Sequence, residues 1–213
     1  MSLSKNEDSV CLALSGSSQE TKNLKLLRIG GLCGILGSAL PLMMVLAATV
    51  LSPWFSWDAN ALSELGVGEE SMLFNSAVLL GGVLNFLFTI GLIHYFNREK
   101  QAKIGAASVM LSSVFLALVG IFTIDYHIMH GVAALGYFVL APVGFIIIGH
   151  ATKDSTVKKL SIACGITALI SILILPMIIF VTPFNIGFAV PELIEALIIS
   201  VWVIFMSTKL LRR

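Results

Sequence analysis

The sequence predicts an all-α, polytopic membrane protein with six transmembrane helices arranged as three hairpins. Of the 213 residues, 57% are hydrophobic and only 12% are charged, whereas a soluble domain has about 25% charged residues. Six apolar runs are long enough to cross a bilayer, which takes about 20 residues at ~1.5 Å each. This composition excludes an ordinary soluble enzyme, a disordered chain and a nucleic-acid-binding protein with a basic face.

The apolar runs place the six spans in order along the chain. The spans are expected at about residues 28–52, 72–95, 104–124, 129–150, 160–182 and 188–208. Residues 1–23 are rich in Ser, Lys, Glu and Asn and predict a disordered cytoplasmic tail. The tail is not a signal peptide, because its apolar run at residues 10–14 is too short for one. Residues 24–213 then form one six-helix transmembrane domain.

The positions of the 13 Lys and Arg residues predict the orientation. They precede the first span, separate spans two and three, separate spans four and five, and follow the sixth. Basic residues are absent between Arg28 and Arg98, between Lys103 and Lys153, and between Lys159 and Lys209. Positively charged short loops stay in the cytoplasm. Each gap therefore predicts a hairpin that crosses the cell membrane and returns, with both termini cytoplasmic.

The acidic residues collect on the opposite, outer side. Seven of the 12 acidic residues are expected there: Asp58, Glu64, Glu69, Glu70, Asp125, Glu192 and Glu195. His127 and His130 join them, and no Lys or Arg is available there as a partner. In the first outer loop, Asp58 has the residue type of a helix N-cap and Gly66 that of a helix stop. Residues 58–66 are therefore expected to form a short helix over the mouth of the bundle.

Helical spacing gathers the polar residues of the spans on a few faces. His127 and His130 are three residues apart, as are Glu192 and Glu195, so each pair shares a helix face. Polar side chains are costly in lipid, and these faces should turn toward the bundle interior. An imidazolium of His127 or His130 is the expected partner of Glu195, which lies deepest of the acids.

These patterns predict an outward-facing pocket that is lined by spans two, four and six and covered by residues 58–66. The candidate catalytic residues are Glu64, His127, His130, Glu192 and Glu195. The candidate binding residues are Asp58, Asn60, Ser63, Asn75, Asn85 and Asp125.

Two further chemistries stay open for this site. His127, His130 and Glu192 are ligand types that zinc accepts, but the His pair at i, i+4 of helical zinc enzymes is absent. No cofactor is therefore expected, and a metal is the weaker alternative. A Ser-His-Asp hydrolase would use Ser63 as its nucleophile, although no nucleophile elbow supports that arrangement.

Several motifs carry a family resemblance over nearly the whole chain beyond the tail. They are Ala61-Leu62-Ser63-Glu64-Leu65-Gly66-Val67, Leu73-Phe74-Asn75, the His130 region, and Pro191-Glu192-Leu193-Ile194 followed by Trp202. The chain resembles archaeal and bacterial six-span proteins classed as domain of unknown function 998. More distantly, its layout is similar to the superfamily of FGF-receptor-activating protein and damage-regulated autophagy modulators, some of which act in lipid-anchor remodelling.

The resemblance implies a six-span fold and points to particular positions. These are Asn60, Ser63, Glu64, Asn75, His130 and Glu192, with Glu64 standing where an aspartate is also common. It implies no settled activity, so whether the protein is an enzyme stays open.

Three functions are compatible with the sequence. The favoured one is a protein that binds or acts on membrane lipid or a lipid headgroup, since acids, His and Asn gather at one depth. A small-solute or ion-coupled transporter is the alternative, supported by Asn85 and by the prolines within the spans. A non-catalytic scaffold would use the outer acids as a docking surface. Membrane lipids are the expected partners, and the oligomeric state stays open.

Overall fold

The computed structural model describes the backbone of residues 3–181 and 187–213, and the side chains of residues 20–174 and 187–213. Its long helices are α1 (Leu3–Leu51), α2 (Ser71–Tyr95), α3 (Lys100–Ile121), α4 (His127–Ala151), α5 (Ser155–Val181) and α6 (Ala189–Leu211). Two short 3₁₀ helices, η1 (Leu62–Gly66) and η2 (Ile124–Tyr126), lie in the connections before α2 and α4. The described part of the chain contains no strand.

Among the described residues, six helices are long and apolar enough to cross a membrane, which confirms the predicted all-α class with six candidate spans. The helices extend beyond several of the predicted spans, because the helical backbone continues past the apolar run into polar residues. For example, the third helix begins at Lys100 and not at residue 104. The predicted end of the fifth span, residue 182, lies outside the described residues.

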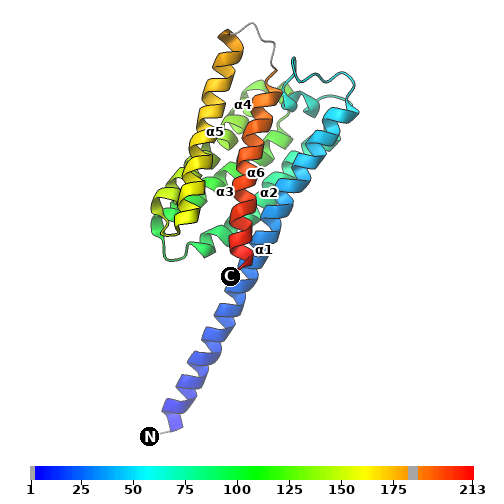
Figure 1. The fold of residues 1–213 in the computed structure, drawn as a ribbon. Helices are drawn as coiled ribbons and strands as arrows, with labels where there is room; N and C mark the ends of the chain where they lie inside the picture. Colours follow the sequence, from blue (N-terminus) through cyan, green and yellow to red (C-terminus); the bar gives the residue numbers. More distant parts are fainter. Residues whose placement is uncertain (1–2, 182–186) are drawn as a thin grey trace.

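The first helix begins far earlier than its apolar run. Helical backbone is described from Leu3, whereas we expected a disordered tail up to residue 23. The membrane-crossing part of α1 is Glu20–Leu51, and the preceding residues continue beyond the bundle (Figure 1). Extending an existing helix avoids the cost of nucleating a new one. The helix can therefore continue from the span into the preceding residues, among which Lys, Glu and Leu have high helix propensity.

The helices form a closed ring in which each contacts its neighbours in sequence and α1 contacts α6. The C-terminus and the projecting part of α1 lie at the same end of the bundle, which we call the terminal end (Figure 1). Residues 52–70 and the start of α6 lie at the other end, which we call the loop end. Which end faces the cytoplasm stays a prediction from the basic residues.

Glycines allow neighbouring helices to approach closely at two crossings. A Cβ atom at Gly30 of α1 would lie 2.9 Å from the Cα atom of Gly91 of α2. A Cβ atom at Gly105 of α3 would lie 2.7 Å from the carbonyl oxygen of Gly144 of α4. Such contacts leave no room for a larger residue. Close backbone approach is a main source of helix association in lipid, where the hydrophobic effect contributes little.

Aromatic side chains fill the centre of the bundle, in the half of the helices nearer the terminal end. Trp202 of α6 is fully buried and stacks on Phe145 of α4, with ring centroids 3.9 Å apart. Its other neighbour, Phe88 of α2, meets it edge to face at 6.4 Å. The indole N–H donates a 2.8 Å hydrogen bond to Oγ of Ser161 in α5. One side chain thus joins four helices.

Asp154 joins the α4–α5 connection to the end of α6. Its Oδ1 accepts the backbone N–H groups of Thr156 (2.9 Å) and Val157 (3.1 Å), so that Asp154 caps α5. Its Oδ2 accepts a 2.8 Å hydrogen bond from Nζ of Lys209. The bond from Lys209 is the main cause that lowers the pKa of this carboxyl below its usual range, and the two backbone bonds add to it.

We expect acidification to weaken the fold through Asp154. Because its pKa is lower when the protein is folded, its ionised form stabilises the fold fully above the ordinary value of 3.8. This contribution is lost as the pH falls through the lower folded value. Since 34% of the Asp154 side chain is exposed, solvent screening limits the ion pair to about 0.5 kcal/mol. The cap adds about 1 kcal/mol.

Thermal unfolding between pH 3 and pH 7 measures this effect. Asp154→Asn keeps a capping side chain and loses only the ion pair, whereas Asp154→Ala loses both. Wild type and Asp154→Asn should therefore differ at pH 7, and the difference should become smaller toward pH 3. Asp154→Ala should be the least stable at pH 7. Identical pH profiles for all three proteins would contradict the assignment.

Candidate functional site

Residues 57–66, which we call the lid, close the loop end of the bundle. Glu64 organises the lid by accepting two hydrogen bonds from residues just before it. Its Oε1 accepts the backbone N–H of Ala61 at 2.9 Å, and its Oε2 accepts Nδ2 of Asn60 at 2.6 Å. The Asn60 side chain in turn accepts the backbone N–H of Ser56 at 2.9 Å. Glu64 and Asn60 therefore shape the lid.

The lid differs from the predicted helix in type and starting point. It contains a 3₁₀ helix over Leu62–Gly66, and not a helix that begins after Asp58. Asp58 is exposed and does not cap a helix, so that prediction is wrong. The physical reason is that Glu64 caps the N–H of Ala61 from inside the turn. This bond starts the helical segment three residues later than an Asp58 cap would.

Three hydrogen bonds attach the lid to the start of α6. The backbone N–H of Gly187 donates to the Trp57 carbonyl at 3.1 Å, and that of Ala189 donates to the Asn60 carbonyl at 3.0 Å. The backbone N–H of Leu62 donates to Oε2 of Glu192 at 2.7 Å. On the other side, Nδ2 of Asn75 in α2 donates to the Gly66 carbonyl at 2.9 Å. The lid is therefore fixed to both α6 and α2.

A pocket of about 120 Å³ lies beneath the lid. It is lined by the lid and by α1, α2, α3, α4 and α6, so that spans one and three line it in addition to the predicted spans two, four and six. The apolar lining includes Leu42, Val45, Phe74, Val78, Leu116, Val119, Phe138 and Leu193. The polar lining residues are Ser38, Ser63, Asn85, His130, Tyr137, Glu192 and Ser200.

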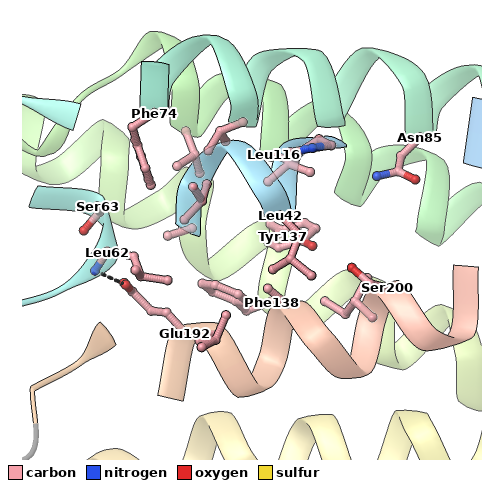
Figure 2. Close-up of a pocket in the computed structure, with 18 of the residues that line it drawn as sticks. Leu42, Leu62, Ser63, Phe74, Asn85, Leu116, Tyr137, Phe138, Glu192 and Ser200 are labelled. Atoms are coloured by element: carbon pink, nitrogen blue, oxygen red, sulfur yellow. Dashed lines mark hydrogen bonds between the residues drawn. The ribbon is translucent and has the colours of Figure 1, made fainter. Parts of the chain in front are cut away.

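Most of the polar groups that Figure 2 labels lie toward the two ends of the pocket, with Tyr137 and apolar side chains between them. Figure 2 shows Ser63 and Glu192 at the lid end, and Asn85 and Ser200 at the other. Glu192 and Ser200 are eight residues apart on α6, which corresponds to about 12 Å. Phe138 lies between these two ends in the same view. The pocket is thus an elongated apolar space with two polar ends.

His130 and His127 have different environments although they are three residues apart. His130 is 8% exposed and lines the pocket, and its Nδ1 lies 2.7 Å from the Phe122 carbonyl oxygen. A carbonyl only accepts, so Nδ1 carries the proton and Nε2 of the neutral ring is an acceptor. His127 is exposed, and its Nδ1 bonds the Asp125 carbonyl at 3.0 Å. Being the first residue of α4, His127 lies outside the packed part of the helix.

Glu195 does not have the histidine partner that we expected. It is fully buried, and its Oε2 accepts a hydrogen bond of 2.5 Å from Oγ of Ser171 in α5. Its Oε1 has no hydrogen-bond partner among the described residues. The expectation was wrong because three residues along a helix turn a side chain by about 60°. That rotation directs Glu195 toward α5, whereas Glu192 faces the pocket.

The remaining predicted site residues lie apart from the pocket. Asp58 and Asp125 are exposed at the loop end. Asn75 holds the lid, and its Oδ1 has no hydrogen-bond partner within the described chain. Among the described residues, no group of three or more His, Cys, Asp or Glu side chains could hold a metal ion. His127, His130 and Glu192 are thus not brought together as such a group in the described structure.

Four predicted residues line the pocket, namely Ser63, Asn85, His130 and Glu192. Ser38 and Ser200 also line it and were not among the predicted site residues. Each is a single serine in an apolar span, and a serine can satisfy itself by bonding to its own helix. Ser38 lies between Gly37 and Pro41, which also line the pocket. This grouping of small and helix-distorting residues is the sequence feature that could have indicated Ser38 as a site residue.

The fold and this pocket define a multi-pass helical membrane protein with an internal cavity at one end of its bundle. The family model described as "Protein of unknown function (DUF998)" matches residues 35–209. The chain belongs to this family, which confirms the resemblance inferred from its motifs. No curated protein and no solved structure matches the chain. The more distant superfamily resemblance stays an expectation.

Proposed function

We propose that the protein binds a membrane amphiphile in the pocket beneath the lid, with the polar head at the lid end and the tail between α1, α2 and α4. The observation that carries this proposal is the distribution of polar groups in the pocket. Ser63 and Glu192 lie at one end, next to a space walled by apolar side chains such as Leu42 and Phe138. His130, near the start of α4, lines the same pocket. The polar head and apolar tail of an amphiphile match the lid end and the apolar space next to it, and Asn85 and Ser200 lie beyond this space.

The charge map supports a location in the outer half of the bilayer. Basic residues lie near the terminal end, and the chain between Arg28 and Arg98 contains none. By the positive-inside rule the terminal end is cytoplasmic. The lid end of the pocket then lies near the outer headgroup region, where a lipid head would sit.

The site favours binding over acyl transfer. Ser63 and His130 both line the pocket, but no hydrogen bond joins them among the described residues. A serine nucleophile needs such a contact with its base. A transport path is also less well supported, because Phe88, Phe145 and Trp202 fill the bundle centre toward the terminal end.

Filling the pocket tests the proposal. Ala196 lines the pocket, and Ala196→Phe should displace the bound amphiphile. Its neighbour Leu197 is 41% exposed and does not line the pocket, so Leu197→Phe is a matched control. Lipids retained by the purified proteins are extracted and counted by mass spectrometry. Wild type and Leu197→Phe should retain one amphiphile per chain, and Ala196→Phe should lose it.

Equal retention by a folded Ala196→Phe protein would overturn the proposal. Thermal unfolding establishes whether each variant is folded. Ser200→Leu fills the opposite end of the pocket and provides a second test should Ala196→Phe not fold.

A further inference from the structure

We infer that the pocket selects an amphiphile whose head is a primary ammonium group. This inference rests on the proposed function and specifies its ligand class. It follows from the kinds of hydrogen-bonding groups that the pocket leaves open. At the lid end, Glu192 and His130 present acceptors to the pocket, and Asn85 presents a further acceptor at the opposite end.

The lid end presents two acceptors. Glu192 accepts the backbone N–H of Leu62 with Oε2, and a carboxylate has lone pairs for further donors. His130 presents Nε2 as an acceptor, because its Nδ1 proton is used by the Phe122 carbonyl. Only 8% of His130 is exposed, and no other described group forms a hydrogen bond with its Nε2. A ligand head must therefore donate hydrogen bonds here.

The inner end presents another acceptor. Asn85 is 9% exposed, and its Nδ2 donates to the Gly37 carbonyl at 3.3 Å. Its Oδ1 is buried and has no hydrogen-bond partner among the described residues. A buried acceptor without a partner is costly, but this one lies at the opposite end of the pocket from Glu192 and is therefore not a contact of the ligand head. The hydroxyl group of Ser63 adapts to either role.

The charges around the lid end also favour a cation. Asp58 and Glu64 of the lid and Glu192, which bonds the lid, lie at this end, and no Lys or Arg among the described residues lies there. A phosphate or carboxylate head would meet acceptors and negative charge without a cationic partner. An ammonium head supplies three donors and a positive charge. Its hydrogen bond to Glu192 would be charge-assisted, and such bonds are roughly twice as strong as neutral ones.

Four probes with the same dodecyl tail test the inference on the purified full-length protein in maltoside micelles. They are dodecylammonium, dodecyltrimethylammonium, dodecanol and dodecanoate, and native mass spectrometry measures the fraction of protein with one probe bound. Dodecylammonium should bind wild type about tenfold more tightly than dodecanol or dodecanoate, a difference of ~1.4 kcal/mol. Dodecyltrimethylammonium should bind less tightly than dodecylammonium, because it has the charge without the donors.

Glu192→Gln should reduce the preference for dodecylammonium over dodecanol to less than about twofold, because the remaining hydrogen bond is neutral. Asp125→Asn removes the same charge from an exposed position outside the pocket and should keep the preference. A preference for dodecanoate, or an unchanged preference in Glu192→Gln, would overturn the inference. If Ala196→Phe leaves binding of all four probes unchanged, the proposed function itself fails. Binding that depends on Ala196 without a preference for ammonium overturns only the ligand class.

A final comparison identifies the source of the ammonium group. The protein is reconstituted in vesicles that contain an ethanolamine-headed lipid, with and without free dodecylammonium, and is then re-extracted. Retention of the lipid in the presence of the amine identifies a lipid head as the ligand. Displacement of the lipid by the amine identifies a free long-chain amine. Retention of only a phosphoglycerol lipid, from a matched vesicle, would contradict an ammonium ligand.

Discussion

Replacing Trp202 with alanine is expected to destabilise the protein by about 3–5 kcal/mol, the range for removing a buried aromatic side chain. Trp202 is fully buried and contacts Phe88 and Phe145. The substitution would leave a large cavity among α2, α4, α5 and α6. It would also remove the donor to Ser161, whose hydroxyl is completely buried. Thermal unfolding in detergent measures the loss.

Two further variants separate packing from hydrogen bonding. Trp202→Phe keeps much of the aromatic volume and loses the indole N–H, so it should cost much less than alanine. Val201→Ala changes the neighbouring residue, which is 54% exposed, and should have little effect. A Trp202→Ala protein that unfolds at the wild-type temperature would show that this cluster does not hold the bundle together.

Replacing Gly187 with alanine is expected to release the lid. A Cβ atom at this position would lie 2.5 Å from the Asn60 carbonyl oxygen and 2.7 Å from the Trp57 carbonyl oxygen. The backbone must then separate, and the hydrogen bonds that Gly187 and Ala189 donate to the lid would break. Two such bonds contribute about 1–3 kcal/mol together. Amide hydrogen exchange in residues 57–66 should therefore become roughly ten- to a hundredfold faster.

Gly131→Ala is the matched control for this experiment. No atom lies within 4 Å of a Cβ placed on Gly131. Alanine in a helix interior is favoured over glycine by roughly 0.5–1 kcal/mol, so this variant should be as stable as wild type or slightly more so. Its lid should exchange at the wild-type rate. Unchanged lid exchange in Gly187→Ala would show that the contact with α6 does not hold the lid in place.

The six spans could be predicted because lipid imposes a simple requirement on composition. A bilayer-crossing helix needs an apolar run of about 20 residues, and six helices in the described part of the chain meet this requirement. The start of α1 could not be predicted in the same way. The residues before its apolar run have no requirement imposed by lipid, and both helix and disorder are compatible with them.

The candidate site could be predicted only in part because side-chain direction depends on tertiary packing. Helical spacing predicts that Glu192 lies on a face of α6 that turns toward the bundle interior, and Glu192 does line the pocket. The same spacing groups Glu195 with it, although Glu195 lies against Ser171 of α5. Likewise His127 and His130 share a helix face, but only His130 is covered by neighbouring segments. Spacing determines an angle on one helix, and it does not determine which neighbour occupies that angle.

Glu192 contacts the lid and also lines the pocket, so the proposed ligand and the closed lid would share one carboxylate. A ligand that donates a hydrogen bond to this carboxylate would change the strength of the hydrogen bond that it accepts from the Leu62 N–H. The lid position in turn changes the acceptor strength that the ligand meets. Thermodynamic linkage makes this coupling equal in both directions. Any ligand that stabilises the closed lid must bind more weakly to the open form by the same factor.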